Sequence, residues 1–198
     1  MIHPLRATIP LLLCLALMGA AAGCTGSGTD GDAGAPAASE ATTEPSVAAP
    51  ARATKVLMGQ VVGPIPGARL RALRHQVTPV IDEWLDTAFV GGEWPRTVTG
   101  AFVGFTPAAA RAARRDRRLV SGADLAARID SVQVTKRAVR YDVLAVGRRP
   151  VGVTARVTLD YRTEGEVRTK VLLRGRVSLT KVGDDWKVFA YDLTKGTR

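Results

Sequence analysis

The hydrophobic pattern changes its period once between Lys55 and the C-terminus. In the first part, apolar residues recur at steps of three and four: Leu70, Leu73, Val77, Ile81, Trp84 and Ala88. This spacing places them along one face of a helix. The pair Thr78-Pro79 interrupts the stripe. Because threonine favours the N-cap and proline the first turn of a helix, we predict two short helices, near 67–77 and 79–91.

The same dipeptide recurs at Thr106-Pro107 and predicts the start of another helix, which runs to about Leu119. Ser121 is followed three residues later by Asp124, a spacing that resembles a capping box and predicts one or two further helical turns. The helical part of the chain would then end just before residue 129.

From Ile129 the period becomes two. The clearest run places the apolar residues Val151, Val153, Ala155, Val157, Leu159 and Tyr161 alternately with small, polar or charged ones. Such alternation is typical of an antiparallel strand with one buried and one wet face. Turn-like breaks divide the region into four strands in meander order, at about 131–146, 151–162, 167–181 and 185–193. Helices followed by antiparallel strands predict an α+β fold.

The N-terminus reads as a secretory signal. Arg6 supplies the positive charge, Ile9 to Met18 the apolar stretch, and Gly19 to Gly23 the small residues before a cleavage site. The apolar stretch is too short for a permanent membrane span. The only cysteine besides Cys24 is Cys14, which lies inside this signal, so the mature chain has no partner for an intramolecular disulfide.

The three residues Ala21-Ala22-Gly23 before Cys24 resemble a bacterial lipobox, with Ala21 where a leucine is usual. The resemblance implies cleavage before Cys24 and transfer of diacylglycerol to its sulfur. It therefore predicts a lipoprotein attached to the cell membrane through Cys24, on the extracytoplasmic face. Two or three acyl chains give stable anchoring, whereas a single chain is marginal.

The segment that follows is rich in Gly, Ser, Thr, Ala and Pro and has almost no large apolar residue up to Thr54. Such a composition cannot bury a core. We therefore expect three parts: a signal peptide over 1–23, a disordered tether over 24–54 that begins at the lipidated cysteine, and one folded domain over 55–198.

The order of helices before a meander, ending in the strand "DDWKVFAYDL" with Trp186-Lys187-Val188, resembles the NTF2-like superfamily. The chain also looks like the small Mce-associated proteins of high-GC bacteria. The resemblance implies N-terminal helices packed in a curved, cone-shaped, four-stranded antiparallel sheet with a pocket at its wide end. Because sheet packing often forms dimers in this superfamily, it also implies a homodimer.

The folded region is strongly basic. Of the 28 basic and 18 acidic residues of the chain, 26 and 14 lie from Lys55 onward, a formal charge of +12. Outside a bacterial membrane, the anionic partners that such a charge favours are lipid head groups, phosphate-bearing wall polymers or acidic envelope proteins, and nucleic acid is not expected there.

The densest basic run is "RAARRDRR", in which Arg111, Arg114, Arg115 and Arg118 share one helical stripe. The stripe could bind phosphate groups, although a solvated helix face is the favoured interpretation. A second set of basic residues lies on the strands, and we expect it to extend the basic surface: Arg168, Lys170, Arg174 and Arg176.

Aromatic residues gather around the end of the second predicted helix and the loop after it. Trp84, Phe89, Trp94, Phe102 and Phe105 belong to this group, and Tyr161 on a predicted strand could join it. The favoured interpretation is core packing, because the chain has few other aromatics to fill its interior. The alternative is the wall of a pocket for a lipid or another apolar small molecule.

Enzymes of the NTF2-like superfamily, such as ketosteroid isomerase and the polyketide cyclases, imply a pocket carboxylate as base and a buried donor for an oxyanion. The candidate bases are Asp82, Asp86, Asp142, Asp160 and Asp192, and the candidate donors are Tyr141, Tyr161 and Tyr191. Asp82 and Asp86 lie one helical turn apart, a spacing more typical of a solvated helix face.

Other kinds of chemistry lack a required part. His75 is the only histidine of the mature chain, so zinc sites and the usual histidine-assisted nucleophiles are not expected, and we predict a surface position for it. The glycines are not arranged as a phosphate-binding loop. We expect no cofactor and no metal. The sequence favours a binding or scaffolding module with a basic surface, and the alternative is a pocket protein with isomerase-like or cyclase-like activity.

Overall fold

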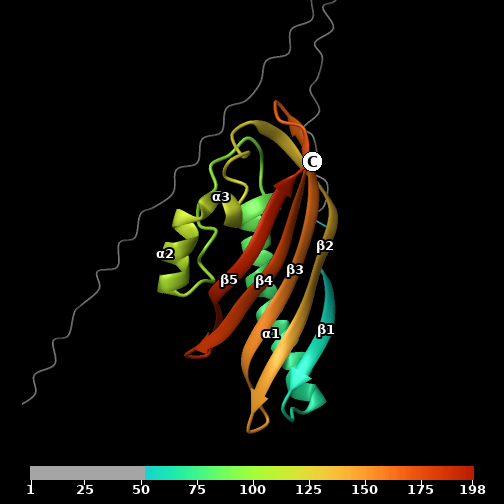
Figure 1. The fold of residues 1–198 in the computed structure, drawn as a ribbon, viewed down its shortest axis with the longest axis vertical. Helices are drawn as coiled ribbons and strands as arrows, with labels where there is room; N and C mark the ends of the chain where they lie inside the picture. The colour runs from blue at the N-terminus through green and yellow to red at the C-terminus, as the bar shows by residue number, and fades with distance from the viewer. Residues whose placement is uncertain (1–51) are drawn as a thin grey trace, which may run out of the picture. The chain divides into compact units, whose positions relative to one another are not determined.

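The computed structural model describes residues 52–198, which form an α+β fold around one mixed sheet (Figure 1). The five strands lie in the sheet in chain order: β1 (Lys55–Val62), β2 (Ile129–Val146), β3 (Arg149–Gly165), β4 (Thr169–Val182) and β5 (Asp185–Thr197). The helical elements lie between β1 and β2: α1 (Gly67–Leu85), the π-helical turn η1 (Asp86–Val90), α2 (Pro107–Arg115) and α3 (Arg117–Val120). The predicted signal peptide, Cys24 and most of the predicted tether lie outside the described residues.

Strands β2 to β5 form the antiparallel meander that the alternation predicts. The prediction of a four-stranded, wholly antiparallel sheet is wrong, because β1 adds a fifth strand that pairs parallel to β2, from Lys55 opposite Ala138 to Val62 opposite Leu144. A register shift between Met58 and Val61 breaks the two-residue alternation of this strand, so the sequence pattern does not indicate a strand here.

The prediction of separate helices at 67–77 and 79–91 is also wrong. Helix α1 continues through Pro79 to Leu85, and the chain then widens into η1. Pro79 points toward solvent, whereas Leu73, Val77, Ile81, Trp84 and Leu85 are buried on the opposite side. An internal proline costs a helix about 3 kcal/mol, but burial of each large apolar side chain contributes about 1.5–3 kcal/mol, so the buried stripe outweighs the interruption.

The helix start predicted at Thr106-Pro107 is confirmed. The Thr106 hydroxyl accepts a hydrogen bond from the main-chain N–H of Ala109 at 3.3 Å, and Pro107 opens helix α2. The helix does not run unbroken to 119, because the chain divides at Asp116 into α2 and the single turn α3. Ser121 introduces a turn in which the N–H of Ala126 donates to the carbonyl oxygen of Gly122, at 3.0 Å.

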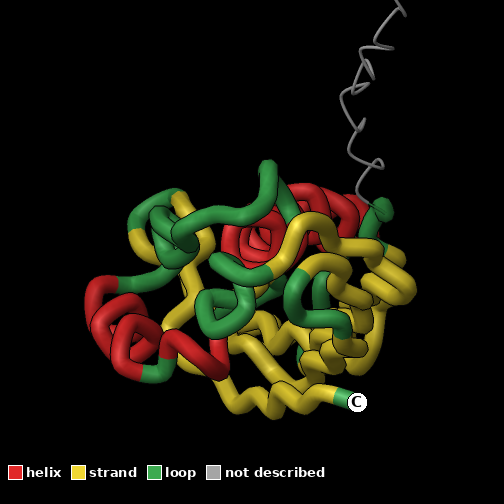
Figure 2. The backbone as a smooth tube through the Cα atoms, turned by 90° about the horizontal axis from the view of Figure 1, so that it is seen from above, coloured by secondary structure: helices red, strands yellow, loops and turns green. Residues whose placement is uncertain are grey.

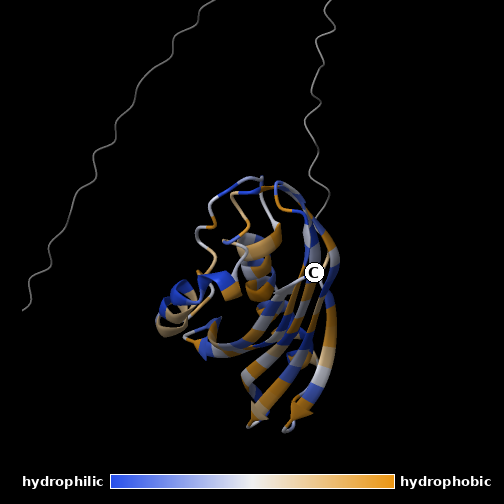
Figure 3. Ribbon diagram, turned by 45° about the horizontal axis from the view of Figure 1, so that its top comes forward, coloured by the Kyte–Doolittle hydropathy of each residue, from blue (hydrophilic) through white to orange (hydrophobic). Residues whose placement is uncertain are grey.

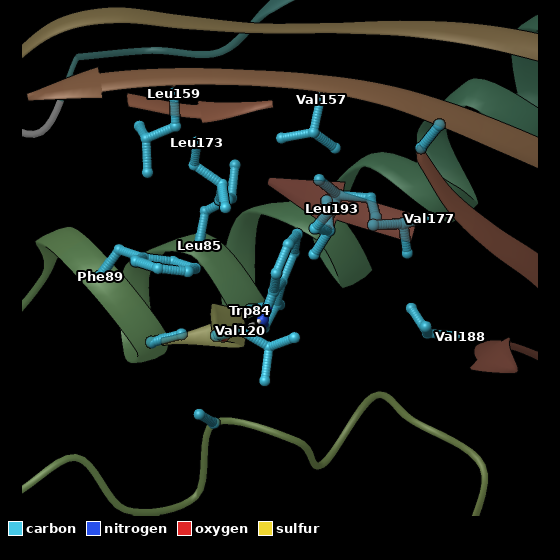
Figure 4. Close-up of a cluster of buried hydrophobic side chains, with 14 of the residues drawn as sticks. Trp84, Leu85, Phe89, Val120, Val157, Leu159, Leu173, Val177, Val188 and Leu193 are labelled. Atoms are coloured by element: carbon cyan, nitrogen blue, oxygen red, sulfur yellow. Dashed lines mark hydrogen bonds between the residues drawn. The ribbon is translucent and has the colours of Figure 1, made fainter. Parts of the chain in front are cut away.

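The core lies between helix α1 and one face of the sheet, the inner face (Figure 2). Trp84 of α1 packs edge-on against Phe89 and Phe105, with ring centroids 5.7 and 6.1 Å apart, and its indole N–H donates to the carbonyl oxygen of Val120. Leu159 and Leu173 of the sheet close the cluster from the other side (Figure 4).

The opposite face of the sheet, the outer face, is covered by none of the described helices (Figures 1 and 2). On β3 the residues Val153, Ala155, Val157 and Leu159 are buried against α1, whereas those between them point to the outer face. The strands therefore alternate between hydrophobic and hydrophilic bands, and the hydrophobic colour gathers at the lower strand ends in Figure 3. The outer face is therefore the face of the sheet that is open to contact with a partner.

Candidate functional site

Three arginines lie side by side across the outer face. In the strand register, Arg140 of β2 is opposite Arg156 of β3, and Arg156 is opposite Arg176 of β4. Neighbouring strands are about 4.8 Å apart, so the three side chains leave adjacent backbone positions. All three residues are exposed. We call Arg140, Arg156 and Arg176 the arginine row.

The acidic residues near this row only partly balance its charge. Arg156 donates to Asp142 and Arg176 to Asp192, each at 2.6 Å, whereas Arg140 forms no ion pair with any described residue. Three guanidinium groups thus stand against two carboxylates. Like charges directly opposite one another destabilise a sheet. An anion placed on the row would relieve this repulsion.

Asp142 favours its negatively charged form on the outer face. Desolvation pushes the pKa of its carboxyl group upward, but hydrogen bonds from Arg156 and from the Gln60 N–H, together with the charges of Arg156 and Arg140, hold the pKa below its usual value. Two residues farther along the same pair of strands, Arg174 of β4 donates to both carboxylate oxygens of Asp160 of β3, at 3.2 Å. Both pairs hold arginine side chains in place on the outer face.

A groove of about 310 Å³ lies on the outer face next to the arginine row. Small residues of β3 and β4, Gly152, Thr154 and Ser178, lie between larger ones, Val62 and Leu144 on one side and Phe189 on the other. Asp142 and Gln60 also line it. We call this hollow the outer groove.

The predicted stripe of helical arginines is exposed but divided. Arg111, Arg114 and Arg115 lie on α2, and Arg118 lies on α3 after the break at Asp116. None of the four forms an ion pair within residues 52–198. Of the strand-borne set, Arg174 and Arg176 belong to the outer face, while Arg168 pairs with Glu164 at 3.3 Å.

The aromatic residues considered for a pocket are part of the core. Trp84, Phe89 and Tyr161 are buried, and Trp94 and Phe102 are partly buried and pack against the same cluster. Arg96 lies 4.3 Å above the Trp94 ring. None of the five lines the outer groove, and none lines a second hollow of about 350 Å³ formed by Val56, Arg74, His75, Thr78 and Pro79.

Asp82 and Asp86 do not form the solvated helix face favoured by their spacing, because both hold the buried Arg137 of β2. The side chain of Arg137 is 3% exposed, against 33% for Asp82 and 40% for Asp86. Its guanidinium donates to both carboxylates, including 2.9 Å to Asp82, and its Nε donates to the Thr54 hydroxyl at 2.6 Å. We call these four residues the Arg137 cluster.

The Arg137 cluster joins the start of the described chain to helix α1 and the sheet. The Thr54 hydroxyl in turn donates to Asp82, and Arg52 donates to the carbonyl oxygen of Thr135 at 2.7 Å. Burial alone would lower the pKa of Arg137, but the hydrogen bonds and charges of Asp86 and Asp82 raise it above its usual value. The arginine therefore stays charged inside the fold.

The candidate general bases are all held by arginines. Asp142, Asp160 and Asp192 pair with the outer-face arginines, and Asp82 and Asp86 with Arg137. A general base acts best with a pKa raised toward neutrality, whereas the pKa of Asp142 is lowered. These pairs favour structural and binding roles for the carboxylates.

The candidate tyrosine donors are bonded elsewhere or buried in the core. Tyr141 donates to the Thr78 hydroxyl at 3.2 Å, and burial raises its pKa to about 12. Burial also raises the pKa of Tyr161. Tyr191 donates to Asp116 at 2.6 Å, and desolvation with this bond raises its pKa to about 12. None of the three forms a hydrogen bond with a candidate base.

His75 is exposed, as predicted. Within the part of the chain that the structure describes, no group of histidine, cysteine and acidic side chains is arranged to hold a metal ion. None of the helices over residues 52–198 is both long and apolar enough to cross a membrane.

The sequence patterns did not single out Arg137 or Arg140. The signal for Arg137 was its position in β2, where it shares the inward parity of Val139 and Tyr141, so a charge there must be buried and paired. The sequence signal for Arg140 was weaker, because the residues that lie opposite it on neighbouring strands are set by the strand register.

Comparisons with protein-family models, with curated proteins and with solved structures found no match to this chain.

Proposed function

We propose that this chain is a lipoprotein of the bacterial cell envelope, anchored through Cys24 on the extracytoplasmic face of the membrane, whose folded domain binds anionic lipid head groups. The arginine row on the outer face is the observation that carries this proposal. Phosphate-bearing head groups are the expected ligand, because guanidinium groups bind phosphate oxygens through paired hydrogen bonds.

The geometry of the outer face supports a flat, extended anionic partner. The three guanidinium groups leave three neighbouring strands of an open sheet, and they are not enclosed in a cleft. A membrane surface presents many head groups in a plane, and each basic residue near it contributes about 1 kcal/mol of attraction. Wall polymers and acidic envelope proteins are the competing partners.

The proposed architecture includes membership of the NTF2-like superfamily and a homodimer. A long helix against one face of a sheet, followed by a meander, supports the former. The uncovered outer face also offers a surface for a second copy, which would compete there with lipid. The proposed role requires no cofactor.

The direct test is binding to lipid vesicles by the predicted mature chain, residues 24–198, carrying Cys24→Ser, so that neither the apolar signal nor an acyl anchor contributes. We expect binding to vesicles that contain phosphatidylglycerol, no binding to phosphatidylcholine vesicles, and weaker binding as salt rises. Arg140→Gln should lower the affinity about fivefold. This substitution breaks no ion pair with a described residue, so it tests the charge without disturbing the fold.

A matched control is Arg111→Gln on α2, which removes the same charge from another exposed position. It should leave vesicle affinity almost unchanged. Equal binding to both kinds of vesicle, or equal losses in the two variants, would contradict the proposal. If an acidic protein or a wall polymer bound saturably and the vesicles did not bind, that partner and not lipid would be the ligand of the arginine row.

A further inference from the structure

The outer groove has the form of a channel between two apolar ridges. Gly152, Thr154 and Ser178 are small residues on β3 and β4, and they form its floor. Leu144 and Val62 rise on one side and Phe189 on the other, and each of these three side chains is about half exposed. Large apolar groups that are left in contact with water on both sides of a hollow favour an apolar occupant.

The groove and the arginine row lie on successive positions of the same strands. Thr154 lines the groove and Arg156 belongs to the row, and on β4 the same holds for Ser178 and Arg176. Two residues of a strand span about 6.6 Å, so the apolar channel begins within one side-chain length of the guanidinium groups. The exposed apolar character continues away from the arginines through Val146 and Val182, which share the outer-face parity of Leu144 and Ser178 on their strands.

The outer face is thus divided into an apolar part and a cationic part that meet at Asp142. This carboxylate would oppose an anion, but it is bonded by Arg156 and by the Gln60 N–H. An anionic group beside the arginine row with a hydrocarbon chain along the groove would satisfy both parts. The volume of 310 Å³ is near the lower end of the range of about 300–1,000 Å³ for ligand sites, which fits one chain.

We propose that the outer groove binds one acyl chain of an anionic lipid whose head group lies on the arginine row. This inference rests on the proposed function and adds to it that the domain takes up part of the lipid and does not only touch the membrane surface. Recognition would then depend on chain length as well as on charge.

Gly152 gives a test that fills the groove without disturbing the sheet. A Cβ atom added at this position meets no atom within 4 Å, and its φ is not in the left-handed region. Valine favours strands, so Gly152→Val should fold at least as stably as the wild type. Gly196 on β5 is a matched control, because it is equally unhindered and lies outside the groove.

The experiment uses isothermal titration of octyl, decyl and dodecyl phosphate, each below its micelle-forming concentration, into the predicted mature chain, residues 24–198, carrying Cys24→Ser. Burial of a methylene group corresponds to about fourfold in affinity, and a partly open groove should give about twofold to fourfold per added methylene. We expect this chain-length dependence in the wild type and in Gly196→Val, and its loss in Gly152→Val. Leu144→Ser, a surface change at the groove wall, should weaken it.

Dodecyl maltoside, which carries no charge, should bind far more weakly than dodecyl phosphate. Affinities that do not change with chain length, or an unchanged dependence in Gly152→Val and Leu144→Ser, would overturn the groove assignment. If vesicle binding still fell in Arg140→Gln under those results, only this inference would fail. If Arg140→Gln changed neither vesicle nor alkyl phosphate binding, the proposed function itself would fail.

Discussion

Removal of the buried guanidinium should be among the most damaging changes in the fold. In Arg137→Met the side chain keeps much of its apolar volume, but the charge and all bonds to Thr54, Asp82 and Asp86 are lost. The carbonyl oxygen of Asp82 also loses a donor, at 3.2 Å. Two carboxylates are then left together without their cation.

The magnitude follows from how far each partner is buried. Breaking a buried ion pair by removing one partner costs about 3–5 kcal/mol. Asp82 and Asp86 are one third or more exposed, so water can partly replace the arginine, and we expect the lower end, about 3 kcal/mol. Arg137→Lys should lose less, because an ammonium keeps the charge but cannot donate to three side chains in fork geometry.

The assay is equilibrium unfolding in urea, with Arg140→Met as the matched control. Arg140 lies on the same strand but is exposed and forms no ion pair with a described residue, so its replacement should change the free energy of unfolding by no more than about 0.5 kcal/mol. With a slope of about 2 kcal/mol per molar urea, Arg137→Met should unfold at about 1.5 M less urea than the wild type. Equal midpoints for the two variants would refute the role given to the Arg137 cluster.

Two further predictions concern local stability and pH. Thr106→Ala removes the side chain that caps α2 and should cost about 1 kcal/mol in urea unfolding, and a cost near zero would show that the cap is not needed. Burial raises the pKa of Tyr141 to about 12, whereas an unfolded tyrosine ionises near 10, so its contribution is fully present below about pH 10 and is lost as pH rises through 12. Stability should therefore decline between about pH 10 and pH 12, less steeply in Tyr141→Phe, and parallel declines would contradict this assignment.

Much of the fold could be predicted from side-chain periodicity. The meander of β2 to β5 and the start of α2 at Thr106 follow from local patterns that neighbouring residues determine. The predicted break at Pro79 was wrong, because the free energy gained by burying one long apolar stripe on α1 exceeds the cost of a proline inside the helix. Strand β1 was missed because its partner, β2, lies far along the chain and its own alternation is broken by a bulge.

The candidate site could be predicted only in part. Alternation on β3 and β4 placed Arg156 and Arg176 on the wet side of their strands, but nothing local shows that they lie opposite each other and beside Arg140. Register depends on turn lengths and on the packing of the buried face. The outer groove also depends on the strand register, because its small residues and its apolar walls come from different strands.

The most direct test of the central claim compares two triple variants in vesicle binding. Arg140→Gln, Arg156→Gln and Arg176→Gln together remove the arginine row, whereas Arg111→Gln, Arg114→Gln and Arg115→Gln remove the same charge from α2. At about fivefold per arginine, the first triple should lose about 100-fold in affinity for phosphatidylglycerol vesicles, and the second less than about fivefold. Similar losses in both, or a larger loss in the α2 triple, would contradict an anion-binding site on the outer face of the sheet.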